Sequence, residues 1–319
     1  MLTFTRYAKN PILAPKRTTP WEAVGTFNGC PILAEDGCHL LYRAQSSKQT
    51  VHGKTLEVSS IGHAISFDRV NFLNRRKIIS PEKPWEKYGC EDPRVTFLEG
   101  TYYIFYTAIA LWPPAPEGIA VAVATTRDFF SITEKHLVTP FNAKAMTMFP
   151  KRINGKIAVM LTVNCDIPPS TIAIAYVDSP EELYSPEYWS AWKHNLDTHS
   201  ISLLRSLHDH VEIGAPPIWT PSGWLLLYSY IKSYLTNHKY FTVEAALLDL
   251  DNPQKILKRT QQPLIHPEFE YELRGNIPNI VFPSGAIVHN NTIGLYYGAT
   301  DTTTCLATIA LDDVLNSMS

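Results

Sequence analysis

A strand motif that recurs five times is the feature that most constrains how this chain can fold. Each copy opens with a turn-forming pair that contains Gly or Asn and continues as an unbroken β-prone run. The runs end at Tyr42, Tyr106, Leu161, Tyr228 and Tyr296, which are separated by 64, 55, 67 and 68 residues. A second apolar run follows each first one, at 60–66, 119–124, 171–176, 241–248 and 304–310. Turn pairs placed between β-prone runs predict hairpins.

Units of about 60 residues built from short strands predict an all-β fold, a five-bladed β-propeller with four-stranded blades. A helical repeat would place apolar residues at i, i+3, i+4 and i+7, and these runs do not. A two-sheet sandwich is the alternative, and it fits the regular spacing less well. We expect residues 1–319 to form a single domain with an insertion at about 180–195. The insertion starts like a short helix, and its aromatic residues are expected to pack it down rather than to touch a ligand.

Composition excludes several classes of function. Lys and Arg number 28 and Asp and Glu number 30, so the formal net charge is −2. This balance gives no basic surface for nucleic acid and no polybasic segment for an anionic membrane, and no apolar stretch is long enough to span one. The start of the chain lacks the pattern of a secretory signal, which predicts a cytoplasmic protein, or a periplasmic one if a leader was removed. Five scattered Cys residues without a Cys-x-x-Cys pair argue against a disulfide framework and a zinc site.

Polar residues recur near the ends of the predicted strands, where a propeller would gather them around one channel. The most unusual string is Glu-Asp-Pro-Arg at 91–94. The proline predicts an extended backbone at Asp92, with Arg94 on the same side of the strand two residues later. A structural ion pair is the alternative for these two residues. Comparable places in the other repeats hold Asn28, Arg43, Asp166, Glu212 and Asp301.

A polar cavity lined by aromatic residues suits a sugar, because hydroxyls need hydrogen bonds while ring faces stack on Trp or Tyr. His208, Asp209 and His210 are candidate metal ligands. Adjacent residues of an extended chain point to opposite faces, so only the two histidines can share one, and we predict no metal. The chain has no Gly-x-Ser-x-Gly motif and no credible Cys/His pairing, so covalent nucleophilic catalysis has no support.

The chain resembles glycoside hydrolase family 130, the β-mannoside phosphorylases and mannosidases, over nearly its whole length. The matching stretches, in the family's order, are Asn-Pro-Ile-Leu at 10–13, Trp-Glu at 21–22, Phe-Asn at 27–28, Leu-Tyr-Arg-Ala at 41–44, Glu-Asp-Pro-Arg at 91–94, Phe-Pro at 149–150, Gly-Ala-Pro-Pro-Ile at 214–218, Gly-Trp at 223–224, Leu-Leu-Asp at 247–249, Phe-Pro-Ser-Gly at 282–285 and Tyr-Tyr-Gly-Ala-Thr-Asp at 296–301. The resemblance implies a five-bladed propeller that acts on β-linked mannosides with inversion. It implies that Asp92 is the proton donor. The resemblance also implies that Asn28, Arg43, Arg94 and Asp301 bind the sugar. Further candidates for sugar binding are Glu91, Asp166 and Tyr228.

The chain departs from the family's phosphorylases where the resemblance places phosphate. Those enzymes use an arginine, often after histidine, at the end of the third repeat's strand, a lysine just before the Gly-x-Gly-Pro-Pro loop, and a histidine at the end of the fourth repeat's strand. Here the first region reads Thr-Val-Asn-Cys-Asp at 162–166, Glu212 stands about where the lysine would be, and Ser229 replaces the histidine. The chain thus lacks three side chains that donate hydrogen bonds to phosphate and gains a carboxylate, which would repel a phosphate dianion and polarise a water molecule.

This departure implies an inverting hydrolase, most similar to mannosidases that cleave β-1,2-mannosides. Such an enzyme pairs a carboxylic acid with a carboxylate that activates water, and we assign these roles to Asp92 and Glu212. Glu268 is a second candidate for the base, with a surface turn as the alternative, whereas Glu270 and Glu272 are expected to be structural or solvated.

Two other functions stay open. One is a phosphorylase that recruits phosphate through Lys144, Lys151 or Arg205, and the other is a non-catalytic mannan-binding propeller. The expected ligand is a β-mannoside oligosaccharide, with no cofactor, nucleic acid or membrane as partner. Linkage and chain-length preference, and whether the chain forms a homo-oligomer, are not fixed by the sequence.

Overall fold

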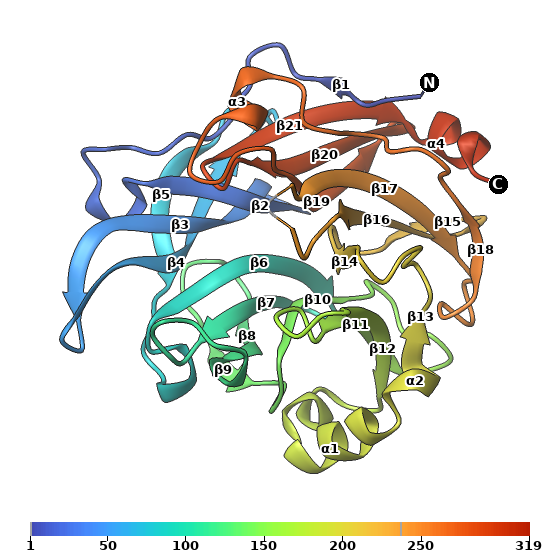
Figure 1. The fold of residues 1–319 in the computed structure, drawn as a ribbon, viewed down its shortest axis with the longest axis horizontal. Coiled ribbons are helices and arrows are strands. Elements are labelled where there is room, and N and C mark those ends of the chain that lie inside the picture. The colour runs from blue at the N-terminus through green and yellow to red at the C-terminus, as the bar shows by residue number, and fades with distance from the viewer. Residues whose placement is uncertain (1, 237) are drawn as a thin grey trace.

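The computed structural model describes residues 2–236 and 238–319. Strands make up 50% of the chain and helices 12%, so the mainly β class is confirmed. Antiparallel pairing divides the described strands into five groups. Figure 1 shows these groups arranged around a common centre.

The five groups share one pattern, in which consecutive strands run antiparallel to each other. The first group contains β2 (Gly25–Ala34), β3 (Gly37–Val51), β4 (Lys54–Ser66) and β5 (Leu73–Ile79). The second contains β6 (Gly89–Leu98), β7 (Thr101–Ile109), β8 (Ile119–Thr126) and β9 (Glu134–Leu137). The third contains β10 (Ala143–Met148), β11 (Ile157–Val163), β12 (Thr171–Val177) and β13 (Ser200–Ile201).

The last two groups vary this pattern slightly. The fourth contains β14 (His210–Ile213), β15 (Ile218–Thr220), β16 (Gly223–Lys232), β17 (Tyr240–Leu248) and β18 (Ile256–Arg259). The fifth contains β19 (Val281–His289), β20 (Thr292–Ala299), β21 (Thr303–Ala310) and the N-terminal β1 (Thr5–Arg6). Because β1 pairs with β21, the two ends of the chain meet in one sheet.

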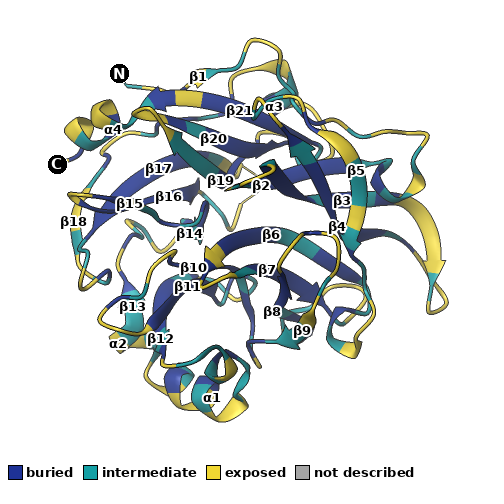
Figure 2. Ribbon diagram, turned by 180° about the vertical axis from the view of Figure 1, so that it is seen from behind, coloured by how far each residue is buried: buried dark blue, intermediate teal, exposed yellow. Residues whose placement is uncertain are grey.

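The core lies between the groups rather than inside any one of them. The apolar residues that the structure describes as buried form five clusters, and each cluster joins two neighbouring groups. One of them packs the fifth group against the first, so the contacts run around the whole circle. Figure 2 shows the buried strands of each group facing their neighbours, with exposed residues mainly in the connections. Single parallel bridges, between Thr26 and Thr303 and between Ser59 and Gly89, add backbone links between groups.

A buried glutamate held by a tyrosine hydroxyl recurs in four groups of the described chain. The donor and acceptor pairs are Tyr42 with Glu22 at 2.8 Å, Tyr106 with Glu86 at 2.5 Å, Tyr228 with Glu244 at 2.9 Å and Tyr297 with Glu272 at 2.7 Å. Each carboxylate also meets a cation, namely Arg75, Lys135, Arg205 and Arg6 respectively. Two of the glutamates end Pro-Trp-Glu 3₁₀ turns, at Pro20–Glu22 and Pro84–Glu86. A buried carboxylate is tolerated only with such partners, so these pairs fix the turns against the strands.

The insertion at 180–195 forms a 3₁₀ turn (Pro180–Tyr184) and then α1 (Pro186–His194). The side chain of Ser185 caps α1 by accepting a hydrogen bond from the Tyr188 amide. Trp189 and Trp192 are buried, and their indole nitrogens donate to the carbonyls of Leu183 and Ile174. The expected short helix and the packing role of its aromatic residues are therefore confirmed. Figure 1 places α1 at the outer edge, away from the centre.

The remaining helices are short: α2 (Leu196–His199), α3 (Glu270–Leu273), α4 (Leu311–Ser317) and a 3₁₀ turn (Pro116–Gly118). None of the helices in the described residues combines the length and apolar character that a membrane span needs. His208 is exposed while His210 is buried. Residues 2–236 and 238–319 contain no group of three His, Cys, Asp or Glu side chains arranged to hold a metal ion.

The tyrosine–glutamate pairs make a prediction about stability. Tyr106→Phe leaves the buried Glu86 carboxylate without one donor, so we expect the free energy of unfolding to fall by about 1–3 kcal/mol. Chemical denaturation measures this change. Tyr240→Phe, in a ring that is more than a third exposed, is the control and should change it by less than about 0.5 kcal/mol. Equal effects of the two substitutions would contradict the role of the pair.

Candidate active site

The innermost strands are irregular where they face the centre. The pairing register shifts between Phe27 and Cys30 in β2, between Glu91 and Arg94 in β6, between Lys144 and Thr147 in β10, and between Pro283 and Gly285 in β19. In the fourth group a gap separates β14 from β15 instead. Bulges redirect side chains and are common beside active sites. Two of the predicted site residues, Asn28 and Asp92, therefore lie in such bulges.

Asp92 lies in the bulge of β6 with a φ of 52°. The extended backbone predicted from the following proline is therefore wrong, because the bulge outweighs the local preference. Asn28, in the corresponding bulge of β2, has a φ of 51° and donates from Nδ2 to Asp92 Oδ1 at 2.7 Å. The same Asp92 oxygen lies 3.6 Å from Arg43 Nη1. A Cβ added to Gly298 would lie 2.0 Å from Asn28 Oδ1, so Gly298 makes room for this amide.

Arg43 contacts the carboxylates of Glu91 and Asp92 on this side of the centre. Its Nη2 donates to Glu91 Oε1 at 2.7 Å and its Nε to Ser59 Oγ at 3.0 Å. Ser59 in turn donates to the same Glu91 oxygen at 3.1 Å. Burial raises the pKa of Asp301 to about 6, although the Arg43 charge opposes this shift. Asp301 therefore keeps a proton more readily here than in water.

Arg94 connects Asp92 to the fourth group. The side chain is buried, and its Nε donates to the Gly214 carbonyl at 2.5 Å while Nη1 donates to the Asp92 carbonyl at 3.2 Å. Its Nη2 has no hydrogen-bond partner among the described residues. Gly214 directly follows β14, the strand that carries Glu212. Arg94 thus links the backbone at Asp92 to the backbone just after Glu212, and its buried Nη2 is left without a partner among the described residues.

Glu212 stands on β14 opposite Ser229 of β16. Burial raises the pKa of Glu212 to about 7, Asp92 adds to the effect, and Lys144 and Arg94 oppose it. Lys144 Nζ lies 2.8 Å from Asp166 Oδ1, so a second ion pair borders this side. The buried Ser229 hydroxyl has no partner in the part of the chain that the structure describes. A carboxylate with this pKa changes charge near neutral pH, which is what a general base requires.

Two candidates lie away from this cluster. The Glu268 side chain is 57% exposed and pairs with Arg6 at 3.2 Å, so we withdraw it as a second base. Tyr228 is fully buried and its hydroxyl is bonded to Glu244, so we withdraw it as a sugar contact. Three of the run ends, Tyr42, Tyr106 and Tyr228, thus donate to a buried glutamate, so this position of the repeat is structural rather than a binding site.

Of the three cations suggested for phosphate, two also lie elsewhere. Lys151 Nζ stacks 4.2 Å over the Trp219 ring, and Arg205 pairs with Glu244. Lys144 alone among them borders the centre, and Asp166 already neutralises it.

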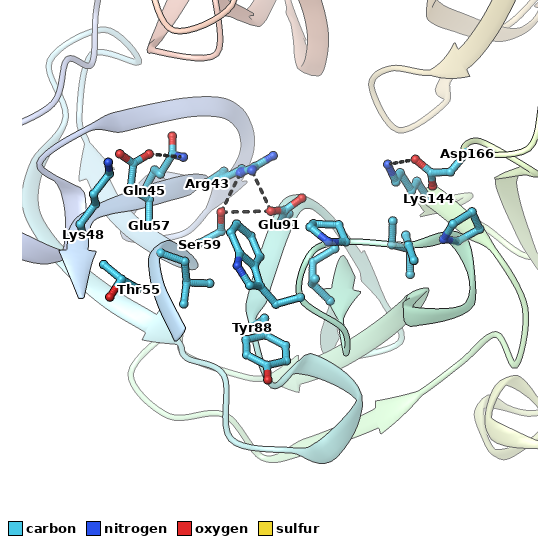
Figure 3. A pocket seen from close by; sticks show the side chains of 17 residues that line it. Arg43, Gln45, Lys48, Thr55, Glu57, Ser59, Tyr88, Glu91, Lys144 and Asp166 are labelled. Carbon is cyan, nitrogen blue, oxygen red and sulfur yellow. Dashed lines mark hydrogen bonds and ion pairs between the residues drawn. The ribbon is translucent and has the colours of Figure 1, made fainter. Parts of the chain in front are cut away.

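A cavity of about 680 Å³ opens beside the carboxylates, between Arg43 and Glu91 on one side and Lys144 and Asp166 on the other. Figure 3 shows these two ion pairs facing each other across it. Further lining residues, which the sequence analysis did not identify, are Gln45, Lys48, Glu57, Tyr88 and Trp112. The first three lie in the β3–β4 hairpin and Trp112 in the β7–β8 connection. The sequence pattern did not predict these residues, because they do not occupy positions that recur from one repeat to the next.

Comparison with known proteins decides the family. The model for glycoside hydrolase family 130, described as β-1,4-mannooligosaccharide phosphorylase, matches residues 5–319. The chain belongs to glycoside hydrolase family 130. Two curated relatives come from Thermoanaerobacter sp. (strain X514): a 1,2-β-oligomannan phosphorylase with 30% identity and a β-1,2-mannobiose phosphorylase with 31% identity. Each alignment covers 98% of this chain and 99% of the relative. The resemblance noted in the sequence is thereby confirmed.

Solved structures agree with this family 130 fold. The β-1,2-mannobiose phosphorylase from Listeria innocua, in complex with β-1,2-mannobiose, superposes with a TM-score of 0.80 at 23% identity, covering 99% of both chains. A structure from a study of family 130 hydrolases that target β-1,2 mannosidic linkages in Candida mannan has a TM-score of 0.76 at 23% identity. It covers 97% of this chain and 94% of that one.

The raised pKa of Glu212 makes stability depend on pH. The folded state binds its proton up to about pH 7, whereas the ordinary value is 4.5. The stability that Glu212 contributes is therefore present below pH 4.5 and is lost as the pH rises through 7. Glu212→Gln should thus raise the free energy of unfolding at pH 8 relative to the unchanged protein, by up to about 3 kcal/mol, and give no such gain at pH 4. Denaturation at both pH values, with the exposed Glu268→Gln as control, measures this; a gain independent of pH would contradict it.

Proposed function

We propose that this family 130 protein cleaves β-mannosidic bonds, with β-1,2-linked manno-oligosaccharides as substrates. The mannoside specificity rests on the family and on the two relatives that act on β-1,2-mannosides. We also propose that the five strand groups are the blades of a five-bladed β-propeller and that residues 1–319 act as one catalytic domain. The circular sequence of apolar clusters supports this architecture.

In this proposal Asp92 protonates the leaving oxygen and Glu212 activates a water molecule on the opposite face of the sugar, which inverts the anomeric centre. Asn28 and Arg43 hold the Asp92 carboxyl from one side. We assign Asp301, Glu91 and Arg94 to the binding of sugar hydroxyls; the raised pKa of Asp301 and the unpaired Nη2 of Arg94 support this assignment. We also assign sugar binding to Asp166, which accepts a hydrogen bond from Lys144 Nζ at 2.8 Å. No cofactor takes part in the proposed steps.

The charge around Glu212 is the observation that leads us to water as the attacking species. Among the described residues, the carboxylates of Asp92, Asp166 and Glu212 share the cations Lys144, Arg94 and Arg43, and Arg43 is also paired with Glu91. Phosphate would add further negative charge to a partly buried site that already holds several carboxylates, whereas water carries no charge. Ser229 and Glu212, which stand where the resemblance expects cationic residues, add no positive charge.

Phosphorolysis is the second candidate, and the relatives favour it. By their names the curated relatives are phosphorylases, so the comparisons support a phosphorylase better than a hydrolase. In such an enzyme Lys144 and the free donor of Arg94 would hold phosphate. A mannan-binding protein without turnover is the third candidate.

Product analysis separates the three candidates. We expect incubation with β-1,2-mannobiose to release mannose at the same rate with and without inorganic phosphate, because water is the attacking species. Chromatography of the products measures this. Mannose 1-phosphate formed only when phosphate is present would establish phosphorolysis, and binding without any product would indicate a mannan-binding role.

Substitution of the two carboxylates tests their roles. Glu212→Gln and Asp92→Asn should each lower kcat by about 10²–10⁴-fold, since each removes an acid or base and keeps the shape. Glu268→Gln, which changes an exposed carboxylate, should leave kcat within about twofold. In the unchanged enzyme kcat/KM should fall as the pH drops below about 7, where Glu212 takes up its proton. Retention of this pH dependence in Glu212→Gln would reassign it to another group.

A further inference from the structure

The cavity beside the carboxylates has two walls of different chemistry. The β3–β4 hairpin supplies a polar wall, in which Gln45 Nε2 donates to Glu57 Oε2 at 3.0 Å and Lys48 lies nearby. The β7–β8 connection supplies an apolar wall with Trp112 and Pro114. A pyranose ring has hydroxyl edges and apolar faces, so it matches a site with one wall of each kind.

The polar wall belongs to a hairpin that is longer than its counterparts. The strands β3 and β4 have 15 and 13 residues, whereas β7 and β8 in the next group have 9 and 8. Figure 1 shows this hairpin extending beyond the rest of its group. Of the residues that line the cavity, Lys48, Thr55, Leu56 and Glu57 are in this added length, and Gln45 lies where it begins. The extension therefore builds a wall that a hairpin of ordinary length would not reach.

Charge and shape favour a neutral polyol as the occupant. The cations that line the cavity, Arg43, Lys48 and Lys144, are matched by the carboxylates of Glu57, Glu91 and Asp166. Such a balance gives no preference for an anion or a cation. The volume of about 680 Å³ is in the range of small-molecule sites. Trp112 is 38% exposed, so an apolar ring face packed on it would remove apolar surface from water.

The cavity lies beside the proposed reaction centre, because Arg43 lines it and lies 3.6 Å from Asp92 Oδ1. Glu91 lines it, and Glu91 is the neighbour of Asp92 in the chain. The Arg43 guanidinium contacts the carboxylates of both Glu91 and Asp92. A ligand that fills the cavity would therefore be an extension of the molecule that meets Asp92.

We infer that this cavity binds additional β-linked mannose units of a longer oligosaccharide, and that Trp112 and the Gln45–Glu57 pair set the chain-length preference. The inference rests on the proposed function and assigns a role to residues outside the proposed chemistry. Trp112 packs against a sugar ring, and the hairpin amide and carboxylate bond the hydroxyls of that unit.

The test compares Trp112→Ala with Trp219→Ala, which removes a similarly exposed tryptophan on β15 that does not line the cavity. The measurements are kcat/KM for β-1,2-mannobiose and β-1,2-mannotetraose, and the Kd of the tetrasaccharide by calorimetry. Trp112→Ala should lower kcat/KM for the tetrasaccharide about tenfold and that for the disaccharide less than twofold. Trp219→Ala should change neither. Glu57→Ala, which alters the polar wall, should again affect the tetrasaccharide more, and it carries the test if Trp112→Ala fails to fold.

Equal losses on the two substrates, or no loss on either, would overturn the inference. Failure of the proposed function gives a different result, in which the unchanged protein cleaves neither substrate. In that event the Kd still decides: weakening of tetrasaccharide binding by Trp112→Ala but not by Trp219→Ala supports the cavity site, and equal Kd values overturn it.

Discussion

Buried charge at the centre is the constraint on which the rest of the site depends. Among the described residues, three cations, Arg43, Arg94 and Lys144, face five carboxylates, those of Glu91, Asp92, Asp166, Glu212 and Asp301. A carboxylate out of water is costly unless cations or donors compensate it. An excess of acids therefore makes protonation of some of them favourable. Burial is the main cause of the raised pKa values of Glu212 and Asp301, and the neighbouring carboxylates raise them further, so the acid–base character belongs to the whole cluster.

The scaffold keeps these charges in place. The pairs Tyr42–Glu22 and Tyr106–Glu86 fix 3₁₀ turns to strands, while the bulges of β2 and β6 bring Asn28 and Asp92 together. Arg94 then bonds the backbone of two groups at once. Since these contacts cross between groups, the relative position of Asp92 and Glu212 depends on how neighbouring groups pack. Precise placement of reacting groups is where most catalytic benefit of a rigid fold arises.

Much of the architecture could be predicted because it repeats. Five turn pairs and five apolar runs gave the strands, and the family motifs identified the central residues. The local conformation of Asp92 could not be predicted, since a bulge depends on pairing with β7 rather than on the adjacent proline. Tyr228 and Glu268 were misjudged for a similar reason: the partner of each, Glu244 or Arg6, is distant in sequence or on another strand. Trp112 was missed because it occurs once, in a connection without a counterpart.

The parts of the site that would determine the attacking species and the substrate length come from different groups. Glu212 stands on β14 of the fourth group, whereas the polar wall of the cavity is the hairpin of the first. A change at position 212 alters the charge available to water or phosphate without moving the hairpin. A change in hairpin length alters the cavity without touching the carboxylates. In a fold of similar groups packed in a circle, these two parts of the proposed site can therefore vary separately.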